Sequence, residues 1–231
     1  MTVTTSIDDD LLVVTLDDGD KNALTPEIFQ AVIAALDDHR SAGVLLAGRP
    51  GIFTAGLNVK WMAANGREGV HRLLVDFGRC LMRLWTDPRP TVCAATGHAI
   101  AAGSMFAMAC DHAVAADGGY WGLTETQIDF EMPRFGLALA AANLRADRRE
   151  DLILPGARID AAAAVEAGFA DELAAPEEVL NRADSRVREL MELPSRAYAG
   201  TKARLREDAA AVVLAELDED IQALTAHLPD R

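Results

Sequence analysis

One segment of the chain joins a glycine turn to the start of an apolar helix, a combination that can stabilise negative charge. The apolar run Thr91–Ala95 predicts a short buried strand, and Gly97 ends it. From Ala101 to Cys110 the residues are small or apolar, as in a buried helix. The first amides of a helix lack intrahelical acceptors and carry the positive end of its dipole. The segment predicts either a site for a developing negative charge or a tightly packed helix in an alanine-rich core.

A second glycine turn, residues 51–60, also follows a predicted strand, Val44–Ala47. This turn contains the run Phe53-Thr54-Ala55-Gly56-Leu57-Asn58. The other turn contains the run Gly97-His98-Ala99-Ile100-Ala101-Ala102-Gly103. In this order the runs resemble the two motifs of the crotonase superfamily, the enoyl-CoA hydratase/isomerase family. Those motifs are Phe-small-Ala-Gly-x-Asp/Asn and Gly-x-Ala-x-small-small-Gly, and the resemblance extends over nearly the whole chain.

A third segment, Tyr120–Ile128, adds to the resemblance. Its sequence is similar to Gly-Leu-Asn-Glu-Thr-Gln-Leu in mitochondrial isomerases of the family, and to Asn-Glu-Val-Ala-Ile-Gly in bacterial members called hydratases. Asn22-Ala23-Leu24 likewise resembles a family turn that leads into the first helix. Asp129 departs from the pattern, because the family usually has glycine there. We expect its carboxylate either to reshape the acyl pocket or to face solvent.

The resemblance implies a site that stabilises a thioester enolate. The backbone amides of Leu57 and Ala102 would form the oxyanion hole, and such preorganised donors are often the largest catalytic term. The carbonyl of Ala55 would bind the CoA adenine. The other residues placed at the substrate or CoA are Ala23, Gly56, Asn58, Gly103 and Met105. The alternative for Gly56 and Gly103 is that they serve only turn formation and packing.

The resemblance also identifies a candidate base. Hydratases of the family use two glutamates, of which the first falls at Met105 here and the second at Glu125. Isomerases of the family need only the second. One carboxylate that shuttles a proton needs a raised pKa, which apolar neighbours such as Met105, Ile128 and Phe135 would provide by desolvation. The alternative for Glu125 is a surface or N-cap carboxylate.

The expected function is therefore the shift of a 3-enoyl-CoA to a 2-enoyl-CoA through a thioester enolate, with Glu125 as base. Two alternatives stay open. A hydratase would need another acid, for which Asp129 and Glu131 are the candidates. A non-catalytic acyl-CoA-binding protein would keep the fold without turnover.

Composition narrows the class of protein. Half of the 231 residues are hydrophobic, enough for a sizeable core, and the net charge is −14. Such a surface repels nucleic acid and anionic membranes, so neither is an expected partner. Three widely spaced cysteines, Cys80, Cys93 and Cys110, predict buried free thiols rather than disulfides or a metal site. We expect no cofactor apart from CoA as part of the substrate. The polar N-terminus indicates no signal peptide, and the expected location is cytoplasmic.

The fold class implied by the resemblance is α/β, a ClpP/crotonase-like fold of repeated ββα units with a helical C-terminal region. Residues 1–175 would form the core with the CoA site. Residues 176–231 would form helices, about 176–193 and 195–227, that cover the active site or make a homotrimer or hexamer. Further strands are predicted at Leu11–Leu16 and His112–Ala116, and a loop at 65–69 interrupts a helix from Val59 to Trp85.

Four further polar residues have less specific expectations. His98 is expected to be a packed residue or a turn residue, and Asp111 to make a structural hydrogen bond where the apolar helix ends. Lys202 and Arg204 lie on the predicted terminal helix. They are expected either to meet CoA phosphates or to lie on a solvated helix face.

Overall fold

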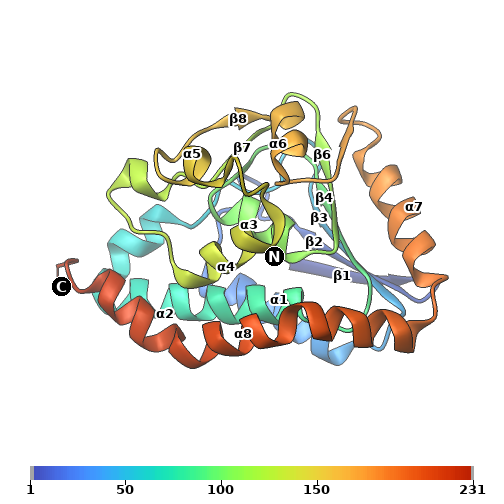
Figure 1. The fold of residues 1–231 in the computed structure, drawn as a ribbon, viewed down its shortest axis with the longest axis horizontal. Helices are drawn as coiled ribbons and strands as arrows, with labels where there is room; N and C mark the ends of the chain where they lie inside the picture. The colour runs from blue at the N-terminus through green and yellow to red at the C-terminus, as the bar shows by residue number, and fades with distance from the viewer. Residues whose placement is uncertain (1–2, 230–231) are drawn as a thin grey trace.

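The computed structural model describes residues 3–229 and has a mixed α/β architecture (Figure 1). The larger sheet has the order β1-β2-β3-β4-β6-β9, with β1 antiparallel to β2 and the other neighbours parallel. Its strands are β1 (Val3–Asp8), β2 (Leu11–Leu16), β3 (Gly43–Gly48), β4 (Thr91–Ala95), β6 (His112–Ala116) and β9 (Glu172–Ala174). The smaller sheet consists of β5 (Ala99–Ile100), β7 (Tyr120–Gly122) and β8 (Ile159–Asp160).

Helices cover both faces of the larger sheet (Figure 1). On one face lie α1 (Pro26–Asp38), α2 (Val59–Trp85) and α3 (Ala102–Ala109). On the other, α7 (Val179–Met191) packs against β3, β4 and β6. The long helix α8 (Ser195–Thr225) runs along α2 and α4 (Arg134–Asn143). The remaining helices are α5 (Arg149–Ile153), α6 (Ala161–Ala167) and the 3₁₀ helix η1 (Glu125–Ile128).

Strand β3 shows why apolar runs predict this sheet well. Val44 and Leu46 contribute to the main core with α1, α2 and α3, whereas Leu45 and Ala47 contribute to the smaller core with α7. Successive side chains of a strand point to opposite faces, so a continuous apolar run fits a strand that has helices on both sides. The predicted strands at β2, β3, β4 and β6 are confirmed.

Two local features differ from the sequence-based expectation. The polar N-terminal residues form β1, an edge strand that pairs with β2 through a turn at Asp9 and Asp10. Its largely exposed residues gave no apolar pattern from which a strand could be predicted. The loop expected at 65–69 is reduced to a kink in α2 at Gly66, where φ is 60° and ψ is −167°.

The expected ββα units are present where a strand of the larger sheet is followed by a short strand of the smaller one. β4 leads into β5 and α3, and β6 leads into β7, η1 and α4. After β3 the second strand is reduced to a single bridge, Thr54 with Ala99, before α2 begins. The repeated unit therefore places a turn and a helix after each of three parallel strands.

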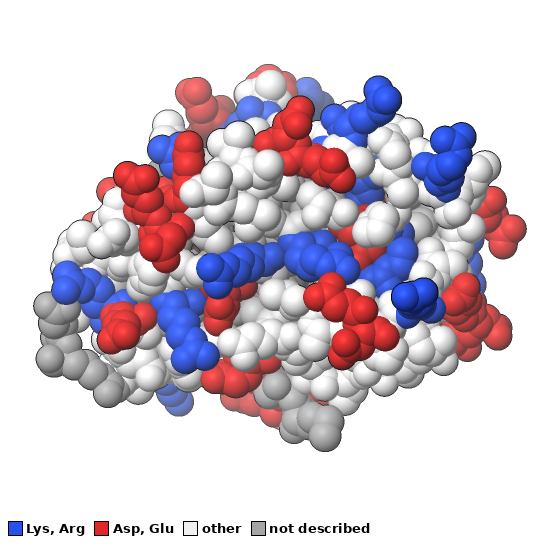
Figure 2. All heavy atoms as spheres, turned by 90° about the horizontal axis from the view of Figure 1, so that it is seen from below, with Lys and Arg blue, Asp and Glu red and all other residues white. Residues whose placement is uncertain are grey.

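The surface seen from below carries intermingled basic and acidic side chains (Figure 2). Negative charge is thus not segregated on this face, despite the net charge of −14. None of the described helices combines the length and hydropathy that a membrane span requires. The three cysteines are buried and free, as predicted.

A buried ion cluster fastens α8 to the end of α3. The carboxylate of Asp111, just after α3, accepts hydrogen bonds from Lys202 Nζ at 2.8 Å and Arg206 Nη1 at 2.6 Å. It also accepts from the Tyr198 hydroxyl at 2.7 Å. The structural role expected of Asp111 is confirmed.

Lys202 differs from both of its expected environments. Its side chain is buried, and desolvation lowers the pKa of its ammonium group against the opposing effect of Asp111. It therefore lies neither on a solvated helix face nor in a position to meet CoA phosphates. Arg204, two positions on, is exposed.

Lys202→Ala should lower the free energy of unfolding by about 3 kcal/mol, because it removes one partner of a buried ion pair. Urea unfolding followed by circular dichroism measures this. The matched control is Arg204→Ala on the exposed face of the same helix, which should change stability by less than about 0.5 kcal/mol. Equal losses in the two variants would contradict the anchoring role of Lys202.

Candidate active site

A row of parallel backbone pairs brings three distant segments side by side. Thr54 pairs with Ala99, and Ala99 pairs in turn with Trp121. Neighbouring strands lie about 5 Å apart, so the two glycine turns and the segment before η1 become neighbours. Because the pairs are parallel, the residues that follow them leave the row in the same direction.

The row determines where the three candidate catalytic residues lie. Leu57 follows Thr54 by three positions, and Ala102 follows Ala99 by three. Glu125 begins η1 three positions after β7 ends. The structure thus assembles in one region three residues that are up to 68 positions apart in the sequence.

The first glycine turn is held in place by its own side chains and backbone. Gly56 has a φ of 85°, a conformation that glycine adopts without the strain a side chain would cause. The Thr54 hydroxyl donates to the carbonyl of Asn22 at 2.6 Å and accepts from the Gly56 amide at 3.0 Å. The Gly56 carbonyl accepts from the Leu24 amide at 2.9 Å. A Cβ added to Gly56 would lie 3.6 Å from the carbonyl oxygen of Ile100, in the second turn.

The second turn contains a strained residue directly before the candidate amide. Ala101 has a φ of 52° and a ψ of −114°, and an alanine in such a region costs about 1–3 kcal/mol. Its amide donates to the carbonyl of Gly122 at 2.7 Å, which fixes the turn against β7. A Cβ on Gly103 would lie 3.0 Å from Thr54 Cγ2, so the start of α3 packs closely on the first turn.

The amides of Leu57 and Ala102 share one property. Within residues 3–229, neither amide donates to a backbone or side-chain acceptor. Ala102 is the first residue of α3 and is buried, whereas Leu57 is half-buried. Two unpaired N–H groups at adjacent glycine turns are available as donors to a bound oxyanion, and their role as an oxyanion hole stays a prediction.

The candidate CoA-binding residues lie around the first turn. Ala55 is exposed, and its amide donates to the Lys21 carbonyl at 2.8 Å. Asn58 caps α2, because its side-chain oxygen accepts from the Trp61 amide at 2.9 Å. Ala23 is half-buried beside this turn. The cap accounts structurally for Asn58, and the CoA contacts of these residues stay a prediction.

Glu125 is the buried carboxylate of the site. Its side chain is 7% exposed, and its Oε2 atom is buried without a hydrogen-bond partner among the described residues. Desolvation raises the pKa of the Glu125 carboxyl to about 7, and a hydrogen bond from its own backbone amide opposes the shift. No charged side chain contributes to this shift. The surface or N-cap alternative for Glu125 is therefore wrong.

The apolar neighbours expected around Glu125 differ in burial. Met105 and Phe135 are buried, whereas Ile128 is 72% exposed and cannot desolvate a carboxyl in this chain. Met105 packs against α4, where a Cβ on Gly136 would lie 3.1 Å from its terminal methyl and 2.7 Å from the sulfur of Met132. Glycine at position 136 thus makes room for two methionine side chains between α3 and α4.

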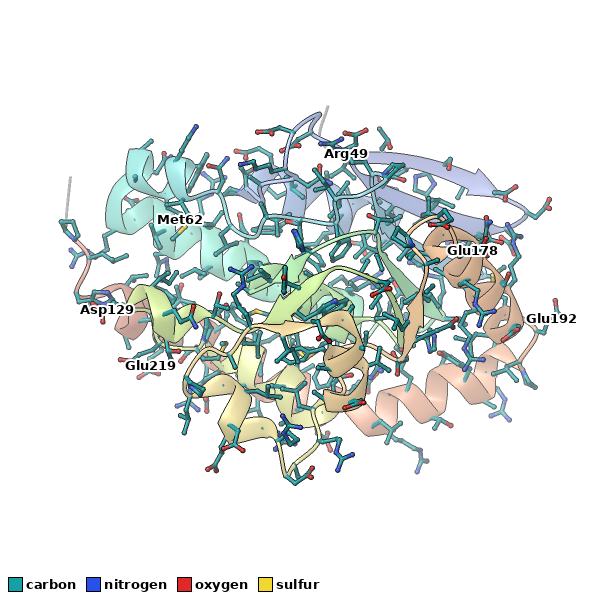
Figure 3. All side chains as sticks on the ribbon, turned by 90° about the horizontal axis from the view of Figure 1, so that it is seen from above. Arg49, Met62, Asp129, Glu178, Glu192 and Glu219 are labelled. Carbon is teal, nitrogen blue, oxygen red and sulfur yellow. The ribbon has the colours of Figure 1, made fainter. Side chains whose placement is uncertain are left out.

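The two candidate second acids are exposed. Asp129 ends η1 in the left-handed conformation, with φ of 57°, and lies at the edge of the molecule at the same end as Met62 (Figure 3). Glycine adopts this conformation most easily, and aspartate is among the residues that tolerate it. Glu131 is also exposed. Of the two expectations for Asp129, the solvent-facing one is confirmed.

Two buried polar residues of the site were missing from the sequence-based predictions. Asn22 Nδ2 donates to the carbonyls of Leu16 and Phe53 at 2.8 and 2.9 Å, which ties the end of β2 to the first turn. Its place in the Asn-Ala-Leu run was a signal for this role. Ser104 contacts both the second turn and β7, and nothing in its apolar sequence context indicated this.

His98 has the turn role expected of it, whereas the packed alternative is wrong because the residue is exposed. Its Nδ1 atom accepts from the Tyr120 amide at 3.1 Å, and its ring stacks on that of Tyr120 at 5.4 Å. Among residues 3–229, no group of three His, Cys, Asp or Glu side chains has a metal-binding arrangement.

Comparisons with known proteins agree with this fold. The sequence profile of Enoyl-CoA hydratase/isomerase matches residues 6–229. A putative enoyl-CoA hydratase of Thermus thermophilus is 31% identical over 77% of this chain and 73% of its own length. An enoyl-CoA isomerase structure from Mycobacterium tuberculosis has a TM-score of 0.89 and 30% identity, covering 98% of both chains. The human mitochondrial Δ3-Δ2-enoyl-CoA isomerase has a TM-score of 0.91 and 25% identity, covering 98% of this chain and 91% of its own.

The fold and the paired glycine turns thus define a crotonase-type protein. The chain belongs to the enoyl-CoA hydratase/isomerase family. Its relatives carry the names of both activities, so family membership gives acyl-CoA chemistry without deciding between isomerase and hydratase.

Glu125→Gln should stabilise the protein relative to the parent as the pH rises. The folded-state pKa of about 7 lies above the unfolded value of 4.5, so the parent loses stability between these pH values as the buried carboxyl ionises. The variant lacks this loss. Between pH 4.5 and 8 its free energy of unfolding should therefore rise by on the order of 3 kcal/mol relative to that of the parent. Urea unfolding at both pH values measures the change. Glu131→Gln controls for loss of one negative charge from the same loop, and an identical pH dependence in parent and Glu125→Gln would refute the burial argument.

Proposed function

We propose that this protein converts a 3-enoyl-CoA to a 2-enoyl-CoA, with Glu125 as the single acid–base residue. The observation that carries the proposal is the isolation of Glu125. It is a buried carboxyl with a pKa near 7, and the position of the first of the two hydratase glutamates is occupied by the buried Met105. A pKa near the operating pH allows one group both to remove and to return a proton.

In the proposed reaction, the amides of Leu57 and Ala102 donate to the thioester oxygen. Glu125 removes a proton from C2, and the electron pair of that C–H bond forms the enolate, whose negative charge the two amides stabilise. The C3–C4 double bond then takes up the proton at C4 from Glu125, and a double bond remains between C2 and C3. One proton leaves and one returns, so the reaction requires no cofactor apart from the CoA that the substrate carries.

Two features disfavour addition of water. Methionine at position 105 cannot hold or activate a water by charge, and both Asp129 and Glu131 are exposed. The name of the human structure supports an isomerase, whereas that of the Thermus thermophilus relative is a hydratase, and structures of the Mycobacterium tuberculosis protein carry both names. Hydration that uses an additional acid is therefore the second candidate, and binding of acyl-CoA without turnover is the third.

The first test concerns Glu125. Glu125→Gln keeps the shape of the side chain and removes the base, so it should abolish the double-bond shift while acyl-CoA binding stays close to the parent's. The assay is exchange of the C2 proton for deuterium in heavy water, together with rates for 3-enoyl-CoA isomerisation and 2-enoyl-CoA hydration in the parent. The parent should isomerise faster than it hydrates. Exchange at the parent rate in the variant would place the base elsewhere.

The second test concerns the oxyanion hole. Leu57→Pro removes one amide without adding charge, and it breaks no hydrogen bond because the bridge between Leu24 and Leu57 uses the groups of Gly56 and Asn58. Activity should fall about a hundredfold or more, as for loss of one oxyanion donor. Circular dichroism and thermal melting must first show a folded variant. A folded variant with near-parent activity would remove Leu57 from the oxyanion hole.

The assembly state is proposed from the family resemblance together with the surface of α8. Leu205 and Val212 on this helix are 75% and 58% exposed. We propose that such residues are covered in a homotrimer or hexamer, with the helices after residue 175 at the interface or over the active site. A cytoplasmic location also stays a prediction.

A further inference from the structure

The hydroxyl of Ser104 links the two strands from which the catalytic segments extend. Ser104 is in the first turn of α3 and is fully buried. Its Oγ donates to the carbonyl of Ala99 in β5 at 2.5 Å and accepts from the amide of Gly122 in β7 at 3.2 Å. One oxygen atom therefore uses both its donor and its acceptor capacity across the smaller sheet.

The two linked strands end close to the catalytic groups. Ala102 lies two positions before Ser104 on the same helical turn, and Glu125 lies three positions after Gly122. Leu123, directly after Gly122, is fully buried, which limits the freedom of the short connection to Glu125. A shift of β7 relative to α3 would change the distance between the oxyanion amide and the base.

Gly122 is confined from two sides. Its φ is 151°, and a Cβ added to it would lie 2.2 Å from the carbonyl oxygen of Ala157. On its other side, its carbonyl accepts from the Ala101 amide at 2.7 Å and its amide donates to Ser104. Without Ser104, the Gly122 amide and the Ala99 carbonyl would both lose a buried partner.

The strained backbone of Ala101 increases the effect that loss of the Ser104 hydrogen bonds should have on the site. Strained backbone persists only where the surrounding structure enforces it. The amide of Ala101 is held by Gly122 and its carbonyl by the Met105 amide at 3.1 Å. Loss of the Ser104 hydroxyl would loosen the contact between β5 and β7. The strained backbone of Ala101 would then relax, and the N–H of Ala102 would point in a different direction.

We infer that Ser104 is a positioning residue, whose hydroxyl fixes the Ala102 amide of the oxyanion hole relative to Glu125. The inference rests on the proposed function, because it assigns a purpose to the distance between those two groups. It predicts that Ser104 affects the rate of the chemical step more than substrate binding, since it touches neither substrate nor reacting atoms.

The test compares Ser104→Ala with the parent in two measurements. The isomerisation kcat should fall about ten- to a hundredfold, while KM changes less than about threefold. A loss of this size is expected when a catalytic group is displaced by up to about 1 Å. Infrared spectroscopy of a bound saturated acyl-CoA reports polarisation of the thioester carbonyl. The low-frequency shift of that band in the parent should be reduced in Ser104→Ala.

A matched control separates positioning from general stability. Thr91 is also a fully buried hydroxyl residue, but it lies at the start of β4 and accepts from the Asp111 amide at 3.1 Å. Thr91→Val should lower the melting temperature while it leaves the turnover rate and the carbonyl band as in the parent. Ser104→Thr restores a hydroxyl and should recover most of the lost turnover. If Ser104→Ala does not fold, Ser104→Cys replaces it and should show an intermediate loss because a thiol is a weak donor.

The outcomes are distinguishable. A folded Ser104 variant with the parent's turnover rate and carbonyl band would overturn the positioning role, whatever its melting temperature. A parent protein that exchanges no C2 proton and isomerises no enoyl-CoA would overturn the proposed function instead. In that case the carbonyl band in parent and variant still tests whether Ser104 positions the Ala102 amide.

Discussion

The row of backbone pairs from Thr54 through Ala99 to Trp121 is the constraint on which the rest of the site depends. A single bridge and a two-residue strand contribute little stability by themselves, so the surrounding packing must hold them. The close approach of Gly103 to Thr54 and of Gly122 to the Ala157 carbonyl provides that packing, because a Cβ would be tight at Gly103 and has no room at Gly122. The larger sheet and its helices can therefore be regarded as a support that keeps this short row in register.

Helix α3 connects the larger sheet and its helices to the candidate oxyanion hole. Its first turn carries the Ala102 amide, and its far end is followed by Asp111, which Lys202 and Arg206 hold against α8. A buried ion pair is weak evidence for net stability, because desolvation offsets much of the attraction. Its role here is to hold α8 against the far end of α3, at the opposite end of that helix from the Ala102 amide. The uncompensated burial of Glu125 has the opposite character, because it costs stability as the pH rises from about 4.5 to 7 and, in the proposed function, provides the base.

Much of the fold could be predicted from local patterns, whereas most of the site could not. Apolar runs at Val44–Ala47 and Thr91–Ala95 predicted strands because sheets covered on both faces need continuous apolar sequence. Motif resemblance located Glu125, and its burial then agreed with the expected chemistry. Ala99 pairs with both of the other site segments, and Ser104 bonds to β7. These contacts join separate segments of the chain, and the periodicity of apolar residues within one segment does not reveal them. Lys202 was misjudged for the same reason, since its partner Asp111 lies 91 positions away.

The contrast between isomerase and hydratase chemistry extends beyond the identity of residue 105. Met105 lies between α3 and α4 beside Met132, over a glycine at position 136. A glutamate in that space would place a second carboxyl in an apolar contact, where desolvation and a nearby carboxylate would both raise its pKa. A raised pKa leaves less of such a group as carboxylate at neutral pH, so it would activate a water less well as a base. Conversion to an efficient hydratase therefore requires polar partners from α4 as well as the missing carboxylate, so the packing of α3 on α4 contributes to the proposed preference for moving a proton over adding water.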